Sequence, residues 1–145
     1  TNNYKAIKEL QTFINKYPDS ERVEQCNTLL DGLRDKLSKK SFENAKQYYT
    51  TENYKSAIIA LDNVLIDFPS FENREEVHYL IVKSSYLLAI NSVNTKMEER
   101  LKATLYAYEQ FKDNYNESKY LKVLEDTYNK TNQSLEELKQ KKDEI

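Results

Sequence analysis

The side chains that could do chemistry in this chain are few, and their spacing builds no catalytic or metal-binding set. His78 is the only histidine and Cys26 the only cysteine, so catalytic triads and multi-histidine metal sites lack parts. Gly32 is the only glycine, which excludes a glycine-rich phosphate loop. We therefore predict no catalytic residue, no cofactor-binding residue and no metal ligand, and we expect the chain not to be an enzyme.

Both potentially reactive side chains have simpler structural interpretations. His78 follows Val77 on an apolar helical stripe, which indicates a packing or surface position. Cys26 falls on a stripe with Leu30 and Leu33, which is typical of a buried small hydrophobe. The twelve tyrosines are too many for one core, so most are expected to fill gaps between helices and a minority to serve as binding anchors.

The composition predicts helices joined by short turns. One Gly and two Pro are too few for a β-rich fold, which needs turn residues at every hairpin. The hydrophobic share of 39% suits helices that each bury a single stripe. The formal net charge is −2 and no long basic block occurs, so we expect no nucleic-acid partner.

Apolar residues recur at spacings of three and four along nearly the whole chain, which predicts one buried face per helix. The segment from Glu21 to Tyr49 favours one long helix, either straight or bent near Ser38 to Lys40. Gly32 lies inside its stripe, as a tolerated helix residue or a close-packing point. Turns are expected at residues 17–20, 50–53, 68–70, 91–95 and 116–118, where Pro, Asn, Asp, Ser and Thr gather.

Three segments of the chain align as an internal repeat, beginning at Ala6, Ala57 and Thr104. The middle copy extends backwards to Ala45, and the spacing of its small, aromatic and Pro positions is similar to the tetratricopeptide consensus. Ala45 and Ala57 would lie where two helices approach closely, Tyr48 and Tyr54 would fill the adjoining gaps, and Pro69 would stop the second helix. The period exceeds the roughly 34 residues of a simple repeat, so the helices should be longer than usual.

These patterns predict an all-α fold, a tetratricopeptide-like helical-repeat solenoid. The repeat segments are about 1–20, 21–71 and 72–118, with a terminal capping helix over 119–145, because the last segment becomes steadily more polar. Such arrays present extended surfaces that suit other polypeptides.

Several runs carry a resemblance to a known family. They are Leu33 to Lys40, Ala45 to Tyr49, Tyr54 to Ile58, Leu88 to Ser92 and Glu98 to Leu101, with the helix ends Tyr17 to Ser20 and Phe68 to Pro69. On these residues the chain resembles the BamD (ComL-like) family, the tetratricopeptide lipoproteins of the outer-membrane β-barrel assembly (BAM) machinery. Asn116 stands where the third copy should have Pro, and Phe71 stands where the first copy has Ser20.

The resemblance implies a non-catalytic scaffold at the periplasmic face of the outer membrane. It implies that residues 1–145 are the C-terminal helical-repeat portion of a longer lipoprotein, anchored by a lipid on an N-terminal cysteine. The implied partners are a BamA-like barrel protein, contacted through its POTRA domains, other BAM subunits, and unfolded outer-membrane protein substrates. The alternative is a generic tetratricopeptide adaptor or co-chaperone that binds other proteins or peptides.

The loop from Pro69 to Arg74 is the candidate partner-binding segment. It is long and polar, and Phe71 within it is expected to be exposed. We predict that Phe71, Asn73 and Arg74 contact the partner.

Overall fold

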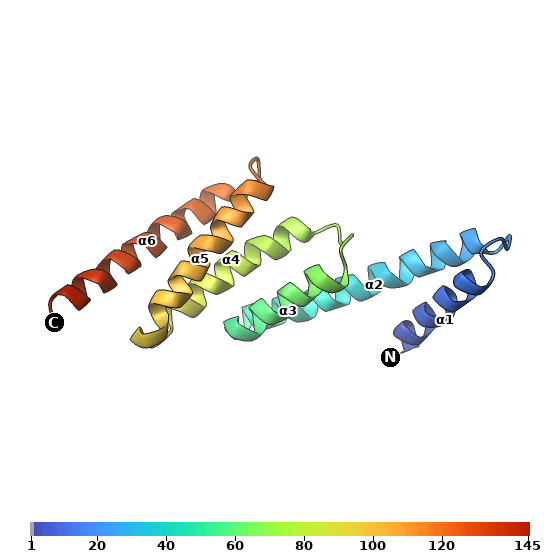
Figure 1. Cartoon of the computed structure of the whole chain (residues 1–145), viewed down its shortest axis with the longest axis horizontal. Coiled ribbons are helices and arrows are strands. Elements are labelled where there is room, and N and C mark those ends of the chain that lie inside the picture. Colours follow the sequence, from blue (N-terminus) through green and yellow to red (C-terminus); the bar gives the residue numbers. More distant parts are fainter. Residues whose placement is uncertain (1) are drawn as a thin grey trace.

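The computed structural model describes residues 2–145, and this part of the chain contains six α-helices and no strand. Consecutive helices run back and forth beside one another, so the array lengthens steadily from the N-terminal to the C-terminal end (Figure 1). The all-α, tetratricopeptide-like fold class is confirmed. The helices are α1 (Asn2–Lys16), α2 (Val23–Thr50), α3 (Tyr54–Asp67), α4 (Arg74–Ile90), α5 (Asn94–Asn114) and α6 (Leu121–Asp143).

The three aligned segments share one turn geometry, found at the ends of α1, α3 and α5. In each, the amide of an aromatic residue just past the helix donates to the carbonyl four residues earlier. In two of the turns a Ser hydroxyl then accepts a hydrogen bond from the amide two residues on, at Ser20 and Ser118. The helix-end pairs are Tyr17 to Phe13 at 2.9 Å, Phe68 to Val64 at 3.0 Å and Tyr115 to Phe111 at 2.8 Å.

Helix α2 is the longest element, and it joins two parts of the array. Its 28 residues span about 42 Å at 1.5 Å per residue. Helix α1 packs on its N-terminal part and α3 on its C-terminal part, while α1 and α3 do not contact each other in the described structure (Figure 1). The single long helix is confirmed. A Cβ added at Gly32 would meet nothing within 4 Å, so Gly32 is a tolerated helix residue and not a close-packing point.

The first core cluster lies between α2, α3 and α4 and contains the predicted small residues. Ala45 and Ala57 are both fully buried, as the repeat consensus requires. The prediction for Tyr48 is wrong, because its side chain is 43% exposed. The neighbouring Tyr49 packs against the core instead and meets Tyr54 edge-on, with ring centroids 5.9 Å apart. Successive side chains are about 100° apart around a helix. A shift of one position is therefore enough to move a side chain from the buried face to the exposed one.

The second core cluster lies between α4, α5 and α6, and tyrosines contribute much of it. Tyr108 and Phe111 are buried there beside Leu124. Tyr79 of α4 stacks on Tyr120 at the start of α6, with ring centroids 4.2 Å apart. Stacked aromatic pairs stabilise a fold beyond the contribution of the area that they bury. These rings therefore hold the last helix on the array.

The N-terminal helix pair is less buried than the others. No residue of α1 is fully buried, and Cys26, which faces α1, is only half-buried. The expectation that Cys26 is a buried small hydrophobe is therefore wrong. The corresponding positions in the later pairs, Val77 and Leu124, are fully buried. Helix α4 packs against four other helices and α6 against two, whereas the N-terminal end of α2 lies beside α1 alone (Figure 1).

Candidate functional site

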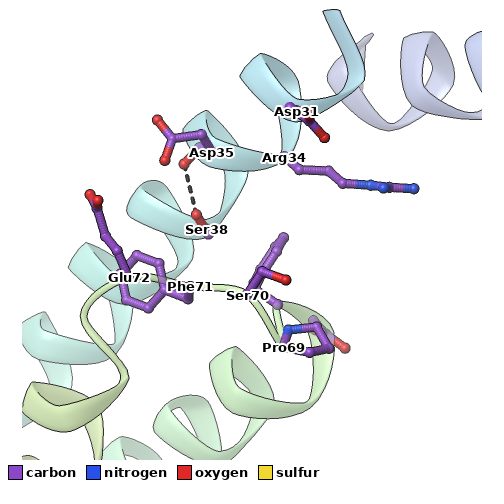
Figure 2. Close-up of a pocket in the computed structure, with 10 residues that line it drawn as sticks. Asp31, Arg34, Asp35, Ser38, Pro69, Ser70, Phe71 and Glu72 are labelled. Carbon is purple, nitrogen blue, oxygen red and sulfur yellow. Dashed lines mark hydrogen bonds between the residues drawn. The ribbon is translucent and has the colours of Figure 1, made fainter. Parts of the chain in front are cut away.

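The α3–α4 loop lies against the middle of α2 and forms a cleft with it of about 600 Å³. Figure 2 shows the loop passing beneath the helix, where Ser70 and Phe71 lie below Ser38 of α2 in this view. The cleft exists because the middle of α2 lies between its contact with α1 and its contact with α3. The lining residues are Asp31, Arg34, Asp35 and Ser38 from α2, and Asp67, Phe68, Pro69, Ser70, Phe71 and Glu72 from the end of α3 and the loop.

The expectation that Phe71 is exposed is wrong, because only 5% of its side chain is accessible. Its ring packs edge-on against Phe42 of α2, with centroids 5.4 Å apart. The loop folds back because burying an aromatic ring of this size is worth several hydrogen bonds. Phe71 therefore holds the loop on α2 and lines the cleft from its core side.

Arg74 also holds the loop in place. Its guanidinium Nη1 donates to the carbonyl oxygens of Leu65, at 3.1 Å, and of Phe68, at 3.3 Å. The last carbonyls of a helix lack partners within the helix and carry negative partial charge, so a cation from the start of α4 stabilises the end of α3. Asn73 is exposed and its side chain makes no capping hydrogen bond to α4.

The cleft is acidic. Four carboxylates and one guanidinium line it, in a chain whose net formal charge is −2. Asp35 pairs with Lys39 at 3.0 Å. Within residues 2–145, Asp31, Asp67 and Glu72 have no cationic side chain within 4.0 Å, so their charge is available to a partner.

The electrostatics of Lys39 show how this surface acts on a cation. The hydrogen bond from Lys39 to Asp35 raises the pKa of the Lys39 ammonium above its ordinary value, and the charge of Glu72 contributes in the same direction. The side chain is exposed, so salt and water screen the effect. The rim of the cleft nevertheless favours positive charge.

No residue of the cleft has the surroundings of a nucleophile or a metal ligand. Ser38 is buried, and its hydroxyl donates to the Asp35 carbonyl oxygen at 2.8 Å. The single histidine, His78, packs against the Tyr115 ring with centroids 5.6 Å apart. Across residues 2–145, no three His, Cys, Asp or Glu side chains gather into a metal-binding group. None of the helices in this range is long and apolar enough to span a membrane.

The sequence placed the loop correctly but missed the residues that give the cleft its charge. Asp31 and Asp35 are one helical turn apart, which puts them on one face of α2. Asp67 and Glu72 flank the Phe68–Pro69 turn. Each acidic pair can be recognised from its own stretch of sequence. That the two pairs line one cleft depends on how the loop folds back on α2.

One comparison with known proteins identifies a family. Residues 1–101 match the YfiO family model, which is described as an outer membrane lipoprotein. The match spans α1 to α4 and the beginning of α5, and it includes every residue that lines the cleft. No curated protein matches the chain.

Proposed function

The chain belongs to the YfiO family of outer membrane lipoproteins, and from this membership we propose that it is a non-catalytic scaffold of the outer-membrane β-barrel assembly machinery. In this role it docks the POTRA region of a BamA-like barrel protein at the periplasmic face of the outer membrane. The docked assembly supports folding and insertion of outer-membrane proteins.

The family match over residues 1–101 is the observation that carries the proposal. The fold supports it, because an open row of helices leaves extended surfaces along its length. The two residues with the greatest reactive potential support a non-catalytic role. His78 packs against an aromatic ring, and Cys26 lines a mostly apolar groove between α1 and α2 that contains no histidine.

We place the docking surface at the α3–α4 loop and the cleft beside it. Asn73 and Glu72 are exposed there and are free to meet a partner directly. Phe71 and Arg74 contribute indirectly, because their contacts with Phe42 and with the end of α3 fix the loop in place.

Affinity purification from the native envelope tests the proposal. The full-length gene product carries a C-terminal tag, is cross-linked in intact cells, and is recovered with its partners for mass spectrometry. Enrichment of a barrel protein with POTRA domains is the expected result. Its reproducible absence, with a different partner enriched, would overturn the assembly role and favour a generic tetratricopeptide adaptor.

A further inference from the structure

We propose that the cleft between the middle of α2 and the α3–α4 loop binds a polypeptide segment that carries a Lys or Arg side chain beside an apolar one. The inference rests on the proposed docking function and names the chemistry of the docked segment. Three features of the cleft carry it: its apolar lining, its charge and its fixed shape.

The apolar lining comes from the loop. Phe68, Pro69 and Phe71 contribute it, opposite the polar face of α2. The volume of about 600 Å³ falls within the range of roughly 300–1,000 Å³ that is usual for ligand sites. A small inorganic cation would leave this apolar surface exposed to water, whereas an apolar side chain of a polypeptide would cover it.

The charge of the cleft specifies the other part of the segment. Asp31 on α2 and Asp67 and Glu72 on the opposite side have no ion-pair partner within the described range. Asp67 is the last residue of α3, where the helix end adds its own negative partial charge. Arg34, the one cation in the lining, extends away from Asp35 and Glu72 (Figure 2). Carboxylates thus line both walls of the cleft, so a cationic side chain within it would lie in a negative field.

The shape of the cleft is set before anything binds. The Phe71 ring is packed on Phe42, and Arg74 ties the start of α4 to the end of α3 through two hydrogen bonds. A loop fixed in this way loses little conformational entropy on binding, which favours affinity for a matching segment.

Fluorescence anisotropy with two labelled peptides tests the proposal on the purified 145-residue chain. In one peptide Lys and Arg alternate with Phe, and in the other Asp and Glu replace the basic residues. The cationic peptide should bind, and the acidic one should not. Raising the ionic strength from about 0.1 M to about 1 M shortens the Debye length from about 10 Å to about 3 Å, so binding should weaken strongly over that range.

A matched pair of double variants assigns the binding to the cleft. Asp67→Asn with Glu72→Gln removes two cleft carboxylates, and we expect the Kd of the cationic peptide to weaken by roughly three- to tenfold. Asp19→Asn with Glu21→Gln makes the same charge change in and beside the α1–α2 turn, which precedes the N-terminal end of α2, away from the cleft at its middle (Figure 1). This control should leave the Kd unchanged. All four side chains are exposed, and thermal unfolding verifies that both variants fold.

Three outcomes would overturn the inference. One is equal weakening in the two double variants, and another is equally tight binding of the acidic peptide. The third is self-association of the chain that the cleft variant abolishes, measured by sedimentation, because the occupant would then be a second copy. If the peptide-binding experiment fails, the result of the envelope purification still stands. If the purification fails to recover the expected partner, the proposed function is lost but the peptide-binding result is unaffected.

Discussion

The ring of Phe71 meets the ring of Phe42 edge-on, with centroids 5.4 Å apart and an interplanar angle of 66°. This contact joins the α3–α4 loop to α2 across 28 intervening positions of sequence. The candidate partner-binding loop is therefore attached to the hydrophobic core, so its conformation and the stability of the array are linked.

Replacing Phe71 with Ala should destabilise the fold by roughly 3–5 kcal/mol, since it removes a buried aromatic ring from the core cluster. Urea unfolding followed by circular dichroism measures the change. Phe71→Leu is the control, because it keeps most of the apolar volume and should cost clearly less. A loss below about 1 kcal/mol for Phe71→Ala would mean that the ring is not part of the core in solution.

Replacing Arg74 with Met should cost about 1–3 kcal/mol, because it keeps the apolar stem but removes the guanidinium hydrogen bonds to the carbonyl oxygens of Leu65 and Phe68. Hydrogen exchange should also become faster at the Phe71 amide, which donates to the Phe68 carbonyl within the same turn. Unchanged stability together with unchanged exchange would show that the guanidinium does not hold the loop.

Stability should fall as the pH drops through the ordinary range of histidine. Burial lowers the pKa of His78, and the nearby Arg74 guanidinium lowers it further. The unfolded chain then binds a proton at a higher pH than the folded chain does. The contribution is fully present above the ordinary pKa of about 6.5, and it is lost as the pH falls from there through the depressed pKa of the folded state.

The control for this pH dependence is His78→Gln, which removes the titrating group. The difference in unfolding free energy between the parent chain and this variant should shrink or reverse as the pH falls below about 6.5. A difference that stays constant between about pH 7 and pH 5 would contradict the lowered pKa, because the carboxylates common to both proteins cancel in the comparison.

Replacing Gly32 with Ala should stabilise the fold by about 0.5–1 kcal/mol. The residue is inside α2, where Gly is unfavourable relative to Ala, and an added Cβ would meet nothing within 4 Å. Thermal and urea unfolding give the sign directly. A destabilising effect would mean that another helix or chain packs closely against this position.

Replacing Ser84 with Ala should leave stability unchanged or raise it by up to about 1 kcal/mol. The Ser84 hydroxyl is fully buried and has no hydrogen-bond partner in the described structure, so its removal relieves a desolvation cost. Thr104→Val provides a contrast, because the Thr104 hydroxyl donates to the Arg100 carbonyl oxygen at 3.0 Å. A clear loss of stability in Ser84→Ala would reveal a partner for this hydroxyl, such as a bound water.

The parts of the fold that could be predicted from sequence are those set by local signals. The stripe periodicity gave the helices, and the Pro-containing turns after Tyr17 and Phe68 gave two of the breaks. Ala45 and Ala57 were predictable because small residues at fixed spacing serve one purpose, the close approach of two helices.

The errors arose where burial depends on contacts between distant segments. Phe71 lies among polar neighbours, so nothing local distinguishes an anchor on Phe42 from an exposed ring. Tyr48 and Tyr49 are adjacent aromatics on one helix, and only the position of α3 decides which is covered. The acidic cleft was missed for the same reason, because Asp31 and Glu72 line one cleft only when the loop folds onto α2.

Isothermal titration calorimetry between this chain and the purified POTRA region of the BamA-like barrel protein from the same cells measures the proposed docking itself. We expect saturable one-to-one binding that weakens in the cleft variant Asp67→Asn with Glu72→Gln and is retained in the control variant Asp19→Asn with Glu21→Gln. Absence of binding to a folded POTRA region, with both proteins verified as monodisperse, would contradict the assignment of this chain as the docking scaffold.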